Sequence, residues 1–342
     1  DRPREPRPRR TPGTPPGQYE LELGVYLLET GKRLPLLDPD GQPQGTAARL
    51  EIRVGVPPQA PRVTDLNIPH PSEQELTPQL GLLGYDVSEE ALLAGQTIHL
   101  RLFWQASGKM GENYRLQLGL RSPEGRLYGQ SELDLLSTDY PTSRWQPGEL
   151  LHDRYDLPTN EEIPTGEMTV ELNLLSESGQ PISTQPVELA KVWLQSTQSS
   201  FDVPAAIEER YEVNLGNQIT LLGYDLEAEP VRPGETAHVT VYWQAQRELE
   251  KSYKVFVHMY DREGNIVAQQ DWLPGLGVKP TTEWEAGEGV ADRHIVPVNE
   301  EVAAGEYAVA VGLYDEESGE RLAAFGPNGE RLSQDRVLLG KV

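Results

Sequence analysis

The sequence predicts an all-β fold of tandem immunoglobulin- or fibronectin-like antiparallel β-sandwiches, about seven strands each: two complete units and the C-terminal part of a third. Segments 82–106 (LLGYDVSEEALLAGQTIHLRLFWQA) and 221–245 (LLGYDLEAEPVRPGETAHVTVYWQA) are near-copies 139 positions apart. Such a repeat indicates one structural unit used twice. Apolar and polar residues alternate within each copy, as in half-buried strands, and no amphipathic helical stripe of sufficient length accompanies them.

Composition limits the functions that the chain can have. The 342 residues, 37% of them hydrophobic, are enough for two or three cores. A formal net charge of −24 argues against binding to nucleic acid or anionic lipid and favours a soluble, acidic surface. The absence of cysteine excludes thiol catalysis, disulfides and cysteine-based metal sites. No stretch reaches the ~20 apolar residues of a membrane span.

The N-terminal region is predicted to be part of an incomplete unit. Its first 16 residues are rich in proline and arginine and are incompatible with a helix. Residues 17–35 match residues 305–323, near the end of the last unit, and an Asp-Arg pair stands before both segments. Residues 1–56 are therefore interpreted as the C-terminal part of a β-sandwich unit. The alternative is a free hairpin with a flexible tail, although isolated hairpins are only marginally stable.

Two linkers are expected between the units. Residues 57–79 carry six prolines and favour extended, semi-rigid chain. Residues 80–195 form the first complete unit. The polar stretch 196–210 is a second linker, in which AAIEER is compatible with one helical turn. The second complete unit covers residues 211–342.

Strands within each complete unit follow the period-two pattern. Turn residues separate them at 122–125, 261–264, 318–319 and 327–329. The first unit is expected to have strands near 98–104, 114–120, 126–135, 150–157, 168–175 and 186–194. The clearest strands of the second unit are 239–243, 253–259 and 307–313.

Tryptophan is the residue type most open to a binding role. Trp104 and Trp243 continue the buried phase of a strand and are interpreted as core residues, with a sugar platform as the alternative. Trp145 and Trp284 stand in long loops and are either plugs at the end of a sandwich or ligand contacts. Trp272 has no counterpart at the 139-residue offset, which makes it the first candidate for an exposed, ligand-contacting aromatic side chain.

The pairs Asp153-Arg154 and Asp292-Arg293 are a signature of both units. Neighbouring residues on a strand point to opposite faces, so each side chain is expected to pair with another strand or a loop. A catalytic role would need a second carboxylate or a nucleophile that the pattern does not supply. No catalytic residues are predicted.

Metal and cofactor signals are weak. Asp38-Pro-Asp-Gly41 resembles the start of a calcium loop but lacks its later acidic ligands, and a β-turn is the preferred interpretation. The acidic stretches 86–90 and 315–317 are weak Ca²⁺ candidates. The six histidines lack the spacing of a zinc helix, and there is no G-x-S-x-G, P-loop or dinucleotide motif. No cofactor and no metal site are therefore expected.

The run LLGYDL…PGET…VTVYWQA…VFVHMYDREGNIVAQQD…PTTEW…GE…DRH…AGEYAVAVGLYDEESGERL carries a family resemblance. It resembles the β-sandwich modules at the C-terminal, extracytoplasmic end of large multi-pass membrane proteins of filamentous, often thermophilic bacteria of the Chloroflexus type. Many of those proteins look like glycosyltransferases of the protein-mannosyltransferase class, whose catalysis lies in the membrane part. The first unit departs from the pattern at Asn173, where the other segments carry Gly24 and Gly312. The resemblance carries no catalytic residue over to this chain.

Two functional hypotheses follow. The first is a non-enzymatic, extracytoplasmic structural or interaction module of a larger cell-surface or membrane-anchored protein. Its partners would be neighbouring β-sandwich units or subunits, with strand exchange at the N-terminal partial unit as one route. The second is a carbohydrate-binding accessory domain of a membrane glycosyltransferase, whose partners would be glycans. An enzyme in its own right is the least supported alternative.

Overall fold

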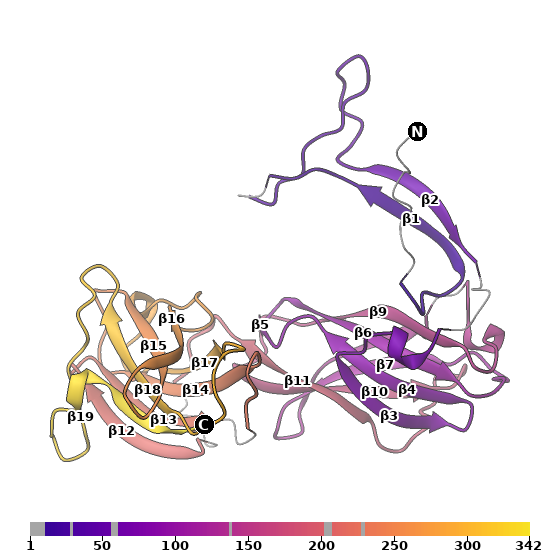
Figure 1. Cartoon of the computed structure of the whole chain (residues 1–342). Helices are drawn as coiled ribbons and strands as arrows, with labels where there is room; N and C mark the ends of the chain where they lie inside the picture. Colours follow the sequence, from indigo (N-terminus) through magenta and orange to yellow (C-terminus); the bar gives the residue numbers. More distant parts are fainter. Residues whose placement is uncertain (1–10, 28–29, 56–60, 137–138, 202–206, 227–229) are drawn as a thin grey trace.

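A computed structural model of the chain describes residues 11–27, 30–55, 61–136, 139–201, 207–226 and 230–342, and it confirms the predicted all-β fold (Figure 1). Helical structure in these ranges is limited to the short 3-10 turns η1 (Val63–Asp65), η2 (Thr142–Arg144), η3 (Thr281–Glu283) and η4 (Ser333–Asp335). No helix within these ranges is long and apolar enough to cross a membrane.

The first sandwich consists of two sheets that enclose one core. The strand orders are β3-β4-β6-β9 and β5-β11-β10-β7-β8, and all pairings are antiparallel except β5 with β11. Both inner faces contribute to the core, which contains Trp104 and Trp145. The strands are β3 (His70–Thr77), β4 (Leu80–Val87), β5 (Ala91–Leu93), β6 (Thr97–Ala106), β7 (Arg115–Arg121), β8 (Leu127–Asp134), β9 (Leu150–Pro158), β10 (Gly166–Leu175) and β11 (Val187–Gln195).

The second sandwich repeats this arrangement around a separate core that contains Trp243 and Trp284. Its strand orders are β17-β14-β13-β12-β19 and β16-β15-β18-β20. The strands are β12 (Glu209–Leu215), β13 (Ile219–Leu226), β14 (Thr236–Ala245), β15 (Tyr253–Tyr260), β16 (Ile266–Trp272), β17 (Gly289–Pro297), β18 (Ala308–Asp315), β19 (Ala324–Phe325) and β20 (Val337–Lys341).

Each sandwich has nine strands among its described residues, not the predicted seven. Because two of these strands begin within the predicted linkers, the predicted linker boundaries are partly wrong. His70–Thr77, inside the predicted linker 57–79, is the strand β3, and β12 begins at Glu209, inside the predicted linker 196–210. Pro71 suggested extended linker, but β3 is an edge strand, where a missing N–H breaks no ladder. The helical turn considered for AAIEER is not formed at 207–210, and residues 205–206 lie outside the described residues.

The glycine of each Leu-Gly-Tyr-Asp motif is required by the strand that precedes the motif: the edge strand β3 in the first sandwich, and β12, which lies between β13 and β19, in the second. Gly84 has a φ of 152° and Gly223 a φ of 157°. A Cβ atom on Gly84 would overlap with the carbonyl oxygen of His70, and one on Gly223 with that of Glu209. The motif therefore marks the place where the preceding strand, β3 or β12, crosses close to its neighbour, at a bulge in both ladders.

The N-terminal strands β1 (Gly17–Leu23) and β2 (Ala48–Val54) form a separate two-stranded antiparallel sheet. This sheet projects away from the sandwiches (Figure 1). The chain before it is fastened to the first sandwich, because His152 N–H on β9 donates to the carbonyl oxygen of Gly13 at 2.9 Å.

Candidate functional site

Trp104 and Trp243 lie in the two cores, and both side chains are fully buried. Each is on the inner phase of the central strand, β6 or β14, as its sequence position indicates. The indole N–H of Trp243 donates to Asp292 Oδ2 at 3.4 Å. These two residues present no ring face to a ligand.

Trp145 and Trp284 are also buried, at 0% and 1% exposure, so the structure contradicts a ligand-contacting role for them. Each follows a 3-10 turn whose first residue is a buried threonine. The Trp145 indole N–H donates to the carbonyl oxygen of Tyr140, and that of Trp284 to the carbonyl oxygen of Lys279, both at 3.1 Å. Their position in a loop suggested exposure, but the loop folds back and uses the indole to close the end of each sandwich.

Trp272 is the one of the three candidate ligand-contacting tryptophans that the structure exposes, at 45%. It ends β16, opposite Val255, and Gly277 lies so close to its indole that a Cβ there would come within 2.9 Å of Nε1. One edge of the ring is thus set against the loop 273–280, and the remainder faces solvent.

Asp292 and Arg293 point to opposite faces of β17, as neighbouring strand residues must. Asp292 is buried and accepts hydrogen bonds from Gly275 N–H at 2.9 Å and from Trp243. His294 Nε2 is 2.8 Å from the same carboxylate. This network joins the loop after β16 to the core and is shielded from solvent.

Arg293 Nη1 donates to Thr240 Oγ1 on the neighbouring strand β14, at 3.0 Å. In the first sandwich, Asp153 Oδ1 accepts a hydrogen bond from Arg154 N–H at 2.8 Å. Burial raises the pKa of Asp153, against the opposing effect of this hydrogen bond. Neither aspartate has a nucleophile beside it in the contacts that the structure gives.

The weak calcium candidates are occupied by protein groups. Asp38 Oδ1 accepts the N–H groups of Asp40 and Gln42, which closes a β-turn. Asp86 lies 3.9 Å from Arg101. The structure gathers no group of three or more His, Asp and Glu side chains suited to a metal ion within its described ranges.

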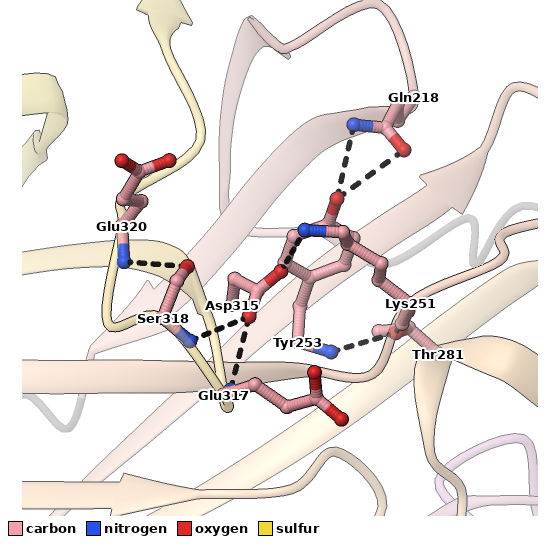
Figure 2. A network of polar contacts seen from close by, with 8 residues as sticks. All are labelled: Gln218, Lys251, Tyr253, Thr281, Asp315, Glu317, Ser318 and Glu320. Atoms are coloured by element: carbon pink, nitrogen blue, oxygen red, sulfur yellow. Dashed lines mark hydrogen bonds and ion pairs between the residues drawn. The ribbon is translucent and has the colours of Figure 1, made fainter.

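Asp315, the third candidate, caps a turn and joins the network in Figure 2. Its Oδ1 accepts the N–H groups of Glu317 and Ser318, both at 2.9 Å, and its other oxygen pairs with Lys251. The hydrogen bond from Lys251 and these two N–H groups lower the pKa of Asp315 from 3.8 to about 2. The carboxylate is thus committed to its own turn.

A pH dependence follows from this network. Because the folded state lowers the pKa of Asp315, its carboxylate stabilises the fold above pH ~4 and loses this effect as the pH falls from about 4 to about 2. We expect Asp315→Asn to be less stable than the wild type at pH 7 and the difference to shrink over that interval. Urea unfolding at several pH values measures it; a difference that is constant from pH 7 to pH 2 would contradict the assignment.

The most extensive polar contacts that no motif indicated lie where the two sandwiches meet. Glu90 Oε2 of the first sandwich is 2.9 Å from His238 Nε2 of the second. The guanidinium of Arg293 lies over the ring of Trp193, 5.7 Å from its centroid, as in a cation–π pair. The hydrogen bond with His238 lowers the pKa of Glu90, against the opposing effect of burial.

The connection between the sandwiches is fastened to the second sandwich. Lys279 Nζ donates to the carbonyl oxygen of Gln198 at 3.1 Å, and Gly289 N–H donates to that of Ser200 at 2.8 Å. Lys279 also forms a buried ion pair with Glu288. Residues 198–200 are therefore held by backbone and side-chain contacts, unlike a flexible linker.

A cleft of about 210 Å³ remains at this junction. Its lining combines aromatic rings with acidic and basic side chains, and two of the basic side chains already face carboxylates: Lys191 is 2.7 Å from Glu167, and His238 contacts Glu90. A larger hollow of about 960 Å³ lies on the first sandwich, where His99 and Asp156 pair at 2.8 Å. In both hollows, basic side chains already contact carboxylates.

Sequence reasoning missed the junction because its partners are far apart in the chain; Glu90 and His238 are separated by 148 positions. A signal was nevertheless present. At the 139-residue offset, Lys279 replaces Tyr140 while the glutamate that each contacts is kept, as Glu288 and Glu149. Differences between otherwise equivalent positions mark where the second sandwich receives the linker.

Comparisons with known proteins give no family. No family model and no curated protein match the chain. Solved structures similar to it include the C-terminal domain of the antigen I/II-family protein AspA of Streptococcus pyogenes (TM-score 0.22, 10% identity, covering 72% of this chain and 98% of that one). Others are E. coli alpha-2-macroglobulin in its native conformation (0.23, 13%, covering 97% and 20%) and a glycosyl hydrolase family 2 member from Bacteroides cellulosilyticus (0.20, 12%, covering 67% and 26%).

The chain thus spans about a quarter or less of the length of the last two proteins. Values this low assign neither a family nor a function. The fold described above rests on the strands and cores of the chain itself.

Proposed function

We propose that the chain is a non-enzymatic structural and interaction module of an extracytoplasmic or cell-surface protein, in which two β-sandwiches act as one spacer of fixed geometry. The observation that carries the proposal is the fastened junction. A spacer transmits position only if its units do not rotate freely, and default inter-domain contacts allow motion. Here a histidine–carboxylate contact, a cation–π pair and backbone hydrogen bonds from the connection join the two units.

The acidic surface and the absence of cysteine are compatible with this role. The family resemblance in segment 221–323 adds that the spacer belongs to a larger membrane-anchored protein. Assembly with neighbouring units or subunits, through strand exchange at the N-terminal sheet β1–β2, is part of the proposal.

The test measures the distance between the two sandwiches. Since the chain has no cysteine, Gln130→Cys and Gln269→Cys place spin labels at equivalent exposed sites on β8 and β16. Pulsed electron–electron double resonance should give one narrow distribution of distances between the two labels, and this distribution should broaden in a His238→Ala/Arg293→Ala variant. His99→Ala, at the position equivalent to His238 but paired with Asp156 within the first sandwich, is the matched control and should leave the distribution narrow. A broad distribution in the otherwise unchanged chain would exclude a fixed spacer.

A carbohydrate-binding accessory function is the second candidate, and the exposed ring of Trp272 is the observation that favours it. Because Trp145 and Trp284 are buried, neither can form a coplanar sugar-binding surface together with Trp272. Binding on a glycan array that disappears in Trp272→Ala would support the function. Binding that is unchanged in this variant, or no binding at all, would reject it.

A further inference from the structure

The segment that contains β1 and β2 resembles the C-terminal part of the second sandwich at an offset of 288 positions, although β1 and β2 pair in a different register from β18 and β20. The hydroxyls of Tyr19 and Tyr307 each donate to the carbonyl oxygen four residues earlier, at 2.9 and 2.6 Å. Isolated β-bridges occur at the same places in both segments: Tyr26 with Arg33 and Leu37 with Pro43 in one, Tyr314 with Arg321 and Phe325 with Arg331 in the other. The two segments therefore share a local fold as well as a sequence pattern.

They differ in what covers them. Leu21 and Leu23 on β1 are 44% and 71% exposed, Val25 just after the strand is 62% exposed, and Leu50 on β2 is 60% exposed. The counterparts of Leu21, Leu23 and Val25 in the second sandwich are fully buried: Val309, Val311 and Leu313. The same pattern that builds a core face in one place thus leaves an uncovered apolar face in the other.

The edge of β1 is equally incomplete. In the second sandwich, β18 lies between β20 and β15, whereas β1 pairs with β2 alone among the described strands. Phe256 on β15 lies opposite Gly312 on β18, and a Cβ on this glycine would come within 2.6 Å of the Phe256 ring. The guanidinium of Arg321 lies over a face of that ring, 4.2 Å from its centroid. The glycine and the arginine together form a seat for the aromatic side chain of the neighbouring strand.

The N-terminal segment keeps both parts of this seat, as Gly24 directly after β1 and Arg33 between β1 and β2. The first sandwich keeps neither: Asn173 and Ile182 stand at the two positions, and the neighbouring strand β7 places Gln117, not an aromatic residue, opposite Asn173. The Asn173 amide donates to Gln117 Oε1 at 3.3 Å. In the two complete sandwiches, glycine and arginine thus occur with an aromatic partner, and asparagine and isoleucine without one.

We propose that β1 and the residues directly after it accept a further antiparallel strand that carries an aromatic residue opposite Gly24. The front strands of a β-sandwich unit of this repeat type supply this strand, and their sheet covers the apolar face. This inference rests on the assembly role proposed above and specifies the partner of that role. Strand addition satisfies the open edge through backbone hydrogen bonds, and the aromatic seat fixes the register.

Size and stability favour this occupant. A two-stranded sheet alone is at best marginally stable in water, and three or more strands with a covered apolar face are needed. The front strands of a unit supply both an added strand and an opposing sheet. A second copy of β1–β2 would also cover the apolar face. It would not supply an aromatic residue with the same neighbours along its strand as Phe256.

The test supplies the front strands directly. A second copy of residues 207–298, which contain β12 to β17, is fused in front of Thr11 in place of residues 1–10. Residue 11 is the joining point because it corresponds to residue 299, the first residue after the added copy. Hydrogen–deuterium exchange of the β1 amides should become slower by on the order of 100-fold relative to the unextended chain. Exchange of β1 that is equally fast in both proteins would overturn the proposal.

Two variants of the extended protein test the aromatic seat. Phe256→Ala in the added copy should return most of the β1 amides to fast exchange, whereas Glu263→Ala, in an exposed turn of the same copy, should not. Arg33→Ala should weaken protection by several-fold in the extended protein and leave the unextended chain unchanged, because the ion pair that its side chain makes there, with Glu22, is exposed to solvent. If Phe256→Ala and Arg33→Ala both leave β1 fully protected, the aromatic seat is rejected.

Light scattering of the unextended chain tests the competing occupant. The chain should be monomeric at micromolar concentration; dimerisation that Leu23→Asp abolishes would make a second copy the partner and overturn the proposal. Failure here can be distinguished from failure of the spacer function, because the distance between labels on β8 and β16 does not depend on β1–β2.

Discussion

Replacement of Trp243 by alanine should lower the free energy of unfolding of the second sandwich by roughly 3–5 kcal/mol. The side chain is fully buried in the centre of the core, so its removal leaves a cavity that the two sheets fill only in part. The substitution also removes the indole donor from the buried carboxylate of Asp292. Denaturant unfolding followed by hydrogen exchange of β14 measures the effect on this sandwich alone.

Trp272→Ala is the matched control for this variant. The residue type and the sandwich are the same, but the ring is 45% exposed, so the expected change is within about 0.5 kcal/mol. Equal effects of the two substitutions would contradict the assignment of Trp243 to the core and of Trp272 to the surface.

Lys279→Met should destabilise the second sandwich by roughly 3–5 kcal/mol, because it leaves the fully buried carboxylate of Glu288 without its cation. The same change removes the hydrogen bond to the carbonyl oxygen of Gln198, so motion between the sandwiches should increase as well. Urea unfolding gives the first effect, and the distance between labels on β8 and β16 gives the second.

Two further variants separate charge burial from packing. Lys279→Met/Glu288→Gln removes the uncompensated charge and keeps an acceptor for the N–H of Glu285, so it should regain most of the lost stability. Lys279→Tyr recreates the arrangement of the first sandwich, where the Tyr140 hydroxyl lies 2.9 Å from both Glu149 oxygens, and should cost less than Lys279→Met. A Lys279→Met protein as stable as the wild type would refute the role of the ion pair.

The strands could be predicted from the sequence because they depend on a local alternation of apolar and polar residues. The two copies of the repeat show the same alternation, which supports each prediction independently. The edge strand β3 could not be predicted, because Pro71 is unusual within a strand. Only the pairing of β3 with β4 at the edge of the sheet shows that a backbone N–H is not needed at this position. Turn preferences placed Asp38 correctly in a β-turn.

The candidate site was less accessible to sequence reasoning. Trp145 and Trp284 lie outside any alternating pattern, so nothing local shows that their loops fold inward. The junction depends on contacts between residues more than a hundred positions apart, such as Glu90 and His238. Comparison of the repeats recovers part of this information: equivalent positions that differ, such as Tyr140 and Lys279, mark the surfaces where the two units meet different surroundings.

That difference between the repeats has a thermal consequence. The loop of the first sandwich is closed by a hydrogen bond from a neutral phenol to Glu149, and that of the second by an ion pair of Lys279 with Glu288. Charged groups lose hydration free energy as temperature rises, so the penalty for burying an ion pair decreases on heating. The two sandwiches therefore respond differently to warming. The ion pair of Lys279 with Glu288, which holds the connecting segment, strengthens relative to the hydrogen bond of Tyr140 with Glu149. The junction between the sandwiches thus gains relative stability at temperatures where the rest of the molecule begins to lose it.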